Sequence, residues 1–252
     1  MPDQILTHQA NGVLHIRINR PEKKNALTLA MYDALTAAVA AGEADAAVRV
    51  LLFSGSNGQF TAGNDLGDFI NNPPDGEDSP VFRFLRTLIA AQKPVVAAVQ
   101  GVAIGIGTTL LLHCDLVYAA PSARFQLPFV NLGLTPEAAS SLILPQLMGH
   151  RRAAQMLLLG DTLDAAAAQA AGLINAVVTE DELEAVAMQK AQELAAKAPQ
   201  AVLLSKQLMK RWSADAVRQT MSAEGEVFIQ RLHSPEALEA ITAFFERRAP
   251  RW

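Results

Sequence analysis

The 252-residue sequence contains a single cysteine, Cys114, and this scarcity already restricts what the protein can be. One cysteine excludes a disulfide within the chain and is typical of a reducing compartment. The first residues, 1–4, lack the basic and apolar stretches of a secretory signal, and the last four, 249–252, do not form a peroxisomal address. We therefore expect a cytoplasmic protein.

The sequence also lacks an excess of positive charge. Lys and Arg number 21 against 25 Asp and Glu, which gives a net charge of −4. No basic stripe is available to neutralise phosphates, so nucleic acid is not an expected partner. With 50% hydrophobic and 18% charged residues, the composition is that of a folded enzyme and not of a disordered chain.

Several motifs of other protein classes are missing. The five histidines show no metal-ligand spacing, so we expect no metal site. His113, Cys114 and Asp115 are consecutive, but neighbours at a helix end point in different directions, so packing explains them better than a catalytic triad. The segment 101–107 is neither a dinucleotide fingerprint nor a Walker loop. The uncharged segment 94–112 has the length of a membrane span, but its proline, glycines and threonines divide it into a strand, a loop and a buried helix, so we expect no membrane partner.

Two glycine-punctuated segments, 58–66 and 101–107, carry the clearest positive signal. They follow apolar runs at 50–53 and 95–99 that read as buried strands, and each leads into helical sequence. A helix that begins directly after such a loop leaves its first N–H groups unpaired and concentrates partial positive charge there. Two such helix starts that converge on one carbonyl oxygen would stabilise an enolate.

The order of elements predicts an α/β fold built as a spiral of ββα turns. A hairpin turns at Asn11-Gly12, and a helix runs from Thr28 to about Gly42, which we expect to stop it. The turn-rich segment 71–80 predicts a mobile surface excursion beside the site. The other expected elements are strands at 5–8, 12–18, 48–54, 95–99 and 116–119, a short helix from about Asp65 and a helix that ends near Gln92.

From Thr179 onward the pattern is helical only, with helices expected at 180–197, 199–211, 214–232 and 235–247. These helices carry more apolar surface than they can bury alone, so they pack on the spiral or on another subunit. We divide the chain into a ββα spiral core, 1–197, and a C-terminal helical oligomerisation region, 198–252.

Several segments together resemble the crotonase, or enoyl-CoA hydratase/isomerase, superfamily over nearly the whole chain. They are RPEKKNAL (20–27), FTAGNDL (60–66), KPVVAAVQG (93–101), CDL (114–116), GD (160–161) and AAGL (170–173). The resemblance implies an acyl-CoA thioester substrate whose carbonyl oxygen lies between the backbone N–H groups of Asn64 and Ile106. Coenzyme A is then part of the substrate, and no separate cofactor is expected. It also implies a homotrimer or a dimer of trimers.

The resemblance also implies which residues contact the acyl-CoA. These are Lys24, Ala26, Leu27, Ala62, Gly63, Asp65, Leu66, Phe129 and Leu132. Lys23, Lys24, Arg247 and Arg248 are candidates for the CoA phosphates, although solvated surface charge is the commoner role of such residues. Asp65 and Asp68 lie at an expected helix start, where capping is the better interpretation.

One carboxylate distinguishes this chain from a hydratase of the family. The two glutamates that such a hydratase uses on water correspond here to Thr109 and Phe129, and neither can act as a base. The segment LPFVNLGLTPE (127–137) instead resembles the peroxisomal type of Δ3,Δ2-enoyl-CoA isomerase, in which the glutamate matching Glu137 is the catalytic base. From the pattern alone, Glu137 would be an acid in the first turn of a helix that Thr135 caps and Pro136 begins.

The expected function is therefore an isomerase that moves the double bond of a 3-enoyl-CoA to the 2-trans position during the degradation of fatty acids or related acyl-CoA thioesters. Apolar neighbours of Glu137 would desolvate it and raise its pKa. Two alternatives stay open. One is hydration, or another reaction of the family, with an unconventional acid; the other is a non-catalytic protein that binds acyl-CoA, because fold does not fix function.

Overall fold

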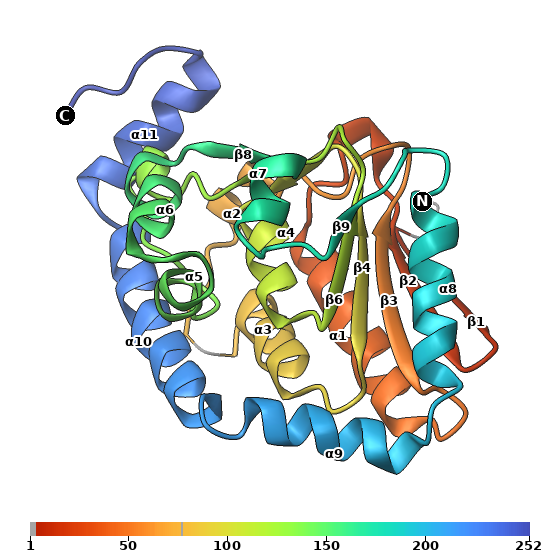
Figure 1. The fold of residues 1–252 in the computed structure, drawn as a ribbon. Helices are drawn as coiled ribbons and strands as arrows, with labels where there is room; N and C mark the ends of the chain where they lie inside the picture. The colour runs from red at the N-terminus through yellow and green to blue at the C-terminus, as the bar shows by residue number, and fades with distance from the viewer. Residues whose placement is uncertain (1–3, 77) are drawn as a thin grey trace.

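The computed structural model describes residues 4–76 and 78–252, which contain a large sheet covered by helices on both faces (Figure 1). The sheet has six strands in the order β1-β2-β3-β4-β6-β9. β1 pairs with β2 in antiparallel fashion, and the remaining neighbours are parallel. The strands are β1 (Ile5–Ala10), β2 (Val13–Ile18), β3 (Val50–Gly55), β4 (Val95–Val99), β6 (Leu116–Ala119) and β9 (Ala176–Val177).

Alternate residues of the central strands face two separate apolar layers. Leu51 and Phe53 of β3 belong to the larger layer with helices α1 (Leu29–Ala44) and α3 (Pro80–Ala90). Val50 and Leu52 face the smaller layer with α8 (Leu183–Ala195). A parallel sheet that is covered on both faces has strands without polar alternation, which is why β3 and β4 read as continuous apolar runs. In Figure 1, α8 lies on one side of the sheet, at the right, and α1 and α3 lie on the other side.

A second, three-stranded sheet in the order β5-β7-β8 carries one of the two glycine segments. Its strands are β5 (Val102–Ile104), β7 (Arg124–Gln126) and β8 (Thr162–Asp164). The segment 101–107, predicted to be a loop, therefore contains a strand and then helix α4 (Ile106–Thr109). Three-residue strands are too short to leave a periodic signal, so the sequence did not predict this sheet.

The expectation that Gly42 stops the first helix is wrong, because α1 continues to Ala44. Gly42 is buried within the helix, where a Cβ atom would lie 2.6 Å from Leu51 Cδ2 and 2.8 Å from Leu14 Cδ2. This glycine therefore permits the close approach of α1 to the sheet. The start of α1 is as predicted, since the Thr28 side chain accepts a hydrogen bond from the Met31 N–H at 3.4 Å.

Short helices lie between the strands of the spiral core. They are α2 (Leu66–Asn71), α5 (Ser140–Met148), α6 (His150–Ala154) and α7 (Ala165–Ala170), with 3-10 turns at Pro21–Lys23, Leu110–His113 and Val130–Leu132 and a π-helical turn at Gln155–Leu159. The segment 71–80, predicted to be a surface excursion, joins α2 to α3, and its residue 77 lies outside the described residues. Within 4–76 and 78–252, no helix combines the length and apolarity needed to cross a membrane.

The last three helices wrap around one side of the molecule (Figure 1). They are α9 (Pro199–Lys210), α10 (Ala214–Leu232) and α11 (Pro235–Glu246), close to the predicted bounds. α10 packs against α5, and its Phe228 ring contacts Phe69 of α2 and Phe129 at centroid distances of 6.1 and 6.3 Å. The C-terminal region thus covers elements of the spiral core.

Candidate active site

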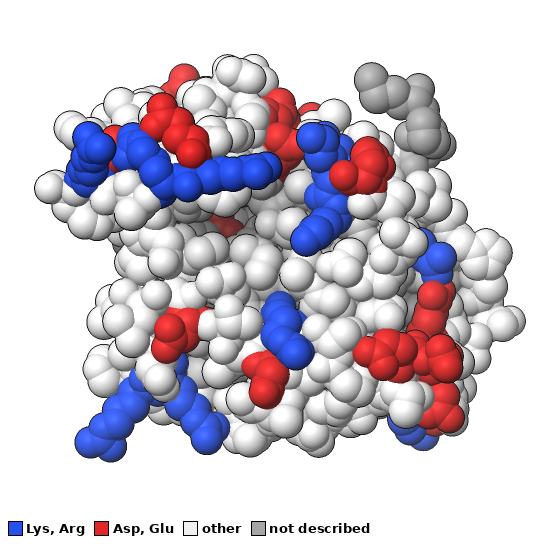
Figure 2. All heavy atoms as spheres, turned by 90° about the horizontal axis from the view of Figure 1, so that it is seen from above, with Lys and Arg blue, Asp and Glu red and all other residues white. Residues whose placement is uncertain are grey.

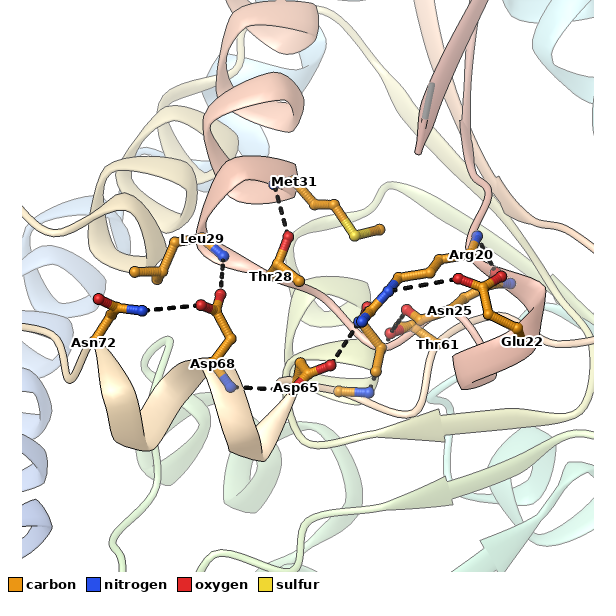
Figure 3. A network of polar contacts seen from close by, with 12 residues as sticks. Arg20, Glu22, Asn25, Thr28, Leu29, Met31, Thr61, Asp65, Asp68 and Asn72 are labelled. Atoms are coloured by element: carbon orange, nitrogen blue, oxygen red, sulfur yellow. Dashed lines mark hydrogen bonds and ion pairs between the residues drawn. The ribbon is translucent and has the colours of Figure 1, made fainter. Parts of the chain in front are cut away.

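The first glycine loop is held in place by the segment 20–27, as Figure 3 shows. The Asn25 side chain, which is fully buried, donates hydrogen bonds to the carbonyl oxygens of Ser56 at 3.0 Å and Gln59 at 2.6 Å. Arg20 Nη1 donates to Asp65 Oδ2 at 2.7 Å, and Thr61 Oγ1 donates to the Asn25 carbonyl at 2.7 Å. The segment 20–27 therefore supports the loop that carries Asn64.

Backbone pairing determines the direction of the Asn64 N–H. Leu27 N donates to Gly63 O and Asp65 N donates to Leu27 O, both at 2.8 Å. Because successive N–H groups of extended backbone point to opposite sides, the Asn64 N–H points away from Leu27. Among the described residues, none accepts a hydrogen bond from it.

The two glycine segments lie side by side. Thr61 N donates to Val102 O at 2.9 Å, and Ile104 N donates to Thr61 O at 3.1 Å. Gly63 has φ +87°, and a Cβ there would lie 2.7 Å from Ile104 O; a Cβ at Gly107 would lie 2.7 Å from Thr61 Cγ2. Only glycines permit this approach. The expected convergence of the two loops is therefore present.

Ile106 begins α4, so its N–H has no partner within the helix. No acceptor for it is found within residues 4–76 and 78–252. Ile106 is 1% exposed and belongs to the larger apolar layer, so its side chain packs into the core. The two amides predicted to form the oxyanion hole are both unused by the described protein groups.

Glu137 is the buried carboxylate of this region, with 1% of its surface exposed. Its Oε1 accepts a hydrogen bond from Thr109 Oγ1 at 3.2 Å, and Thr109 is the last residue of α4. Burial raises the pKa of Glu137 from 4.5 to about 7; the Thr109 hydrogen bond lowers it and the charge of Glu224 raises it further. The predicted rise is confirmed, and Thr109, considered only as a lost acid, proves to be the partner of this carboxylate.

The interpretation of Glu137 as a helix-capping acid is wrong. Helix α5 begins at Ser140, three residues after Glu137, and its N-cap is Ala139. The Thr135 hydroxyl, expected as the cap, is buried and has no hydrogen-bond partner among the described residues. Ala138 and Ala139 adopt φ of +59° and +57°, which delays the helix and leaves Glu137 before it, outside regular secondary structure.

Tyr32 of α1 belongs to the site, although no motif of the sequence points to it. It is 1% exposed, and its hydroxyl donates to Asn64 Oδ1. Burial raises the pKa of Tyr32 well above 10, and the nearby charge of Glu137 raises it further, so the phenol stays neutral. In the sequence, Tyr32 occupies a position of its helix that any apolar core residue could occupy. Only the tertiary structure shows that its hydroxyl contacts Asn64.

The structure confirms capping as the role of the two aspartates (Figure 3). Asp65 Oδ1 accepts from Asp68 N at 3.1 Å, and Asp68 Oδ2 accepts from Leu29 N at 2.8 Å. With its other oxygen paired to Arg20, the Asp65 carboxylate supports the loop. Contact of Asp65 with the acyl-CoA stays a prediction.

The other residues expected to contact the acyl-CoA fall into two groups. Lys24, Ala26, Leu27, Ala62, Gly63 and Leu66 lie in or beside the first loop, where Ala62 N donates to Lys24 O at 2.9 Å. Phe129 is the N-cap of the 3-10 turn before Glu137, and Leu132 is the last residue of that turn. Lys and Arg side chains lie on both sides of a hollow in the upper surface (Figure 2). Among the basic candidates, Arg248 is paired with Glu239 and Glu246, which favours a structural role.

The consecutive residues 113–115 point in different directions, as expected. His113 Nε2 donates to the Ala138 carbonyl at 2.8 Å, Cys114 Sγ lies 3.6 Å from Leu110 O, and Asp115 Oδ2 accepts from Lys206 Nζ at 2.7 Å. Burial raises the pKa of the Cys114 thiol to about 12, so it is not a nucleophile. In the described part of the chain, no three His, Cys, Asp or Glu side chains are grouped to hold a metal ion.

Both the sequence and the fold are similar to those of known proteins. A family model described as enoyl-CoA hydratase/isomerase matches residues 8–252. A solved structure of Pseudomonas aeruginosa OdaA superimposes with a TM-score of 0.95 at 48% identity, covering 97% of this chain and 100% of that one. The fold is therefore the crotonase-like spiral with a C-terminal helical region.

Two curated relatives are similar over nearly the whole chain. The rat protein "Enoyl-CoA delta isomerase 2" is 35% identical over 250 residues, which cover 97% of this chain but only 64% of the relative. The "1,2-epoxyphenylacetyl-CoA isomerase" of Escherichia coli (strain K12) is 36% identical over 262 residues, covering 100% of this chain and 99% of the relative.

Proposed function

Because this chain belongs to the enoyl-CoA hydratase/isomerase family, we propose that it is an isomerase that moves the double bond of a 3-enoyl-CoA thioester to the 2-trans position. The observation that carries the proposal is a buried carboxylate, Glu137, whose pKa burial raises to about 7, in a site with two unused backbone amides. A base with a pKa near neutral pH is suited to take up and release a proton in each turnover.

The reaction needs one base and no water. Glu137 removes a proton from C2 of the substrate, and the negative charge moves onto the thioester oxygen as a dienolate. The N–H groups of Asn64 and Ile106 stabilise that oxygen, and each such donor contributes roughly a hundred- to thousand-fold in rate. The protonated Glu137 then delivers the same proton to C4, which leaves the double bond between C2 and C3.

Hydration is the weaker candidate. It needs groups that activate water and deliver its proton, and Thr109 and Phe129 stand where the resemblance places the two acids. The remaining acid near Glu137 is Glu224, whose oxygens are engaged by the N–H groups of Ala139 and Ser141. A protein that only binds acyl-CoA would not need a carboxylate in a buried site where ionisation is costly.

An assay of the purified protein with 3-enoyl-CoA and 2-enoyl-CoA thioesters tests the proposal. We expect rapid conversion of 3-enoyl-CoA to 2-trans-enoyl-CoA, followed by mass spectrometry and ultraviolet absorbance, and no appreciable 3-hydroxyacyl-CoA from the 2-enoyl substrate. Rapid hydration would favour the first alternative. Binding of acyl-CoA with no turnover of either substrate would favour the second.

We further propose a homotrimer or a dimer of trimers, acting in fatty-acid or related acyl-CoA degradation in the cytoplasm. The assembly is supported by large apolar side chains that α9, α11 and the turn after α9 leave exposed. They include Leu204, Leu208, Met209, Trp212, Leu238, Phe244 and Phe245, with Trp212 83% exposed. The presence of a single cysteine supports a reducing compartment.

A further inference from the structure

The turn between Glu137 and helix α5 has an unfavourable backbone conformation. Ala138 and Ala139 are consecutive residues with a Cβ atom in the left-handed region, at φ of +59° and +57°. The left-handed conformation is unfavourable for a residue with a Cβ atom, because the Cβ comes too close to the following carbonyl oxygen. Two of them in succession persist only if neighbouring groups hold them, so the contacts of this turn are informative.

Glu224 of helix α10 holds the turn from one side. Its Oε2 accepts a hydrogen bond from Ala139 N at 2.6 Å, and its Oε1 accepts from Ser141 N at 2.9 Å and Ser141 Oγ at 2.5 Å. The residue is 9% exposed and lies on the apolar stripe of α10 between Met221 and Phe228. A carboxylate that satisfies two backbone N–H groups fixes their relative position.

His113 holds the turn through the neighbouring residue. Its Nε2 donates to the Ala138 carbonyl at 2.8 Å, and the side chain is 4% exposed. Burial lowers the pKa of His113 to about 4, so the ring is neutral at physiological pH and carries its proton on the nitrogen that faces this carbonyl. The two residues are 111 positions apart in the sequence and bind opposite ends of one peptide group, the C=O of Ala138 and the N–H of Ala139.

We propose that Glu224 and His113 are positioning residues that clamp the turn 138–141 and thereby hold the Glu137 carboxylate in its catalytic orientation. This inference rests on the proposed function, in which Glu137 is the base. It makes the C-terminal helical region part of the active site, because α10 supplies Glu224. A misplacement of about 1 Å at a reacting group costs roughly a hundred-fold in rate, so a clamp of this kind affects turnover more than binding.

The clamp also has an electrostatic consequence. The titratable groups that face Glu137 or its turn are Tyr32 on α1, His113 after α4 and Glu224 on α10. Tyr32 and His113 are neutral near pH 7, so Glu224 is the one whose negative charge opposes ionisation of Glu137. Removing that charge lowers the pKa of the base and moves the acid limb of the activity profile to lower pH.

The test compares Glu224→Gln with Glu226→Gln, an exposed neighbour on the same helix. Glutamine has nearly the size of glutamate, but its NH2 group would face the N–H of Ala139 or Ser141, from which the carboxylate accepts a hydrogen bond. We expect kcat to fall roughly 10- to 100-fold, KM and the Kd for a saturated acyl-CoA to change less than about two-fold, and the acid limb of kcat/KM to move to lower pH. Glu226→Gln should behave as wild type in all three.

Ser141→Ala is a second variant in case Glu224→Gln does not fold. It removes only one of the three hydrogen bonds to Glu224. We expect it to lower kcat by a smaller factor and to leave KM unchanged. Unchanged kcat and acid limb in the folded variants, or a parallel loss of acyl-CoA binding, would overturn the clamp. Glu137→Gln is measured alongside. If it is inactive while Glu224→Gln is normal, only the clamp fails; if it is fully active, the proposed function fails.

Discussion

Glu137→Gln separates catalysis from stability at one position, because the same burial that makes Glu137 a base near neutral pH also makes it costly to ionise. Glutamine has nearly the same shape, and its carbonyl oxygen can still accept the Thr109 hydrogen bond. Loss of the general base should lower kcat on 3-enoyl-CoA by roughly a hundred- to ten-thousand-fold, with acyl-CoA binding largely preserved.

The size of the stability effect follows from the pKa of Glu137, about 7 in the folded protein against an ordinary 4.5. Ionising this group therefore costs the folded state about 3 kcal/mol relative to the unfolded state. Because the folded-state pKa is raised, the wild type has its full stability below pH 4.5 and loses this amount as the pH rises through about 7. The variant cannot ionise, so it should gain about 3 kcal/mol on the wild type between these limits.

Thermal melting of both proteins at pH 4 and pH 8 measures this gain. For a chain of this length, about 3 kcal/mol corresponds to a relative rise of roughly 6–12 °C. The comparison across pH removes the constant cost of burying the glutamine NH2 group. Glu226→Gln serves as the control that changes one exposed charge. Near-normal turnover of Glu137→Gln would refute its role as the base, and a stability difference that is the same at both pH values would refute the raised pKa.

Three further outcomes test the loops and the assembly. Asp65→Asn should keep the helix cap and weaken the pair with Arg20, so kcat should fall less than about ten-fold in the same assay; a loss as large as that of Glu137→Gln would contradict the capping role. Gly63→Ala places a Cβ 2.7 Å from Ile104 O at φ +87°, so we expect a loss of roughly 1–3 kcal/mol in denaturant unfolding and a lower kcat. Normal values for that variant would show that the loops do not need their close approach. Sedimentation at micromolar concentration should give a trimer or hexamer, and a clean monomer would be evidence against the proposed assembly.

Much of the spiral was predictable because its long elements have strong local signals. Apolar runs gave the central strands, and Thr28 gave the start of α1. Gly42 misled, since a glycine near the end of a helix looks the same whether it stops the helix or lets it approach a sheet. The second sheet was missed because its strands have three residues each, fewer than a periodic pattern needs.

The parts of the site that could be predicted are those in which a local sequence motif also determines the backbone conformation. The two glycine segments indicated convergent amides, the family resemblance assigned these amides to Asn64 and Ile106, and the structure places the loops side by side. For Glu137 the local pattern favoured a helix cap, and only the family resemblance indicated a base. No sequence motif marks Tyr32 or Glu224 as part of the site. Glu224 could have been noticed as a charged residue at a position of α10 where the helical pattern predicts an apolar one.

The sequence by itself determined the identity of the chemical groups and the local backbone that presents them, because glycine spacing, caps and apolar runs act over a few residues. The tertiary structure decided what those groups do. Burial raises the pKa of Glu137, a hydroxyl from α4 contacts it, and a carboxylate 87 positions away on α10 holds its turn. Desolvation and long-range hydrogen bonds depend on what surrounds a group in space, and that environment exists only once the distant segments have packed together.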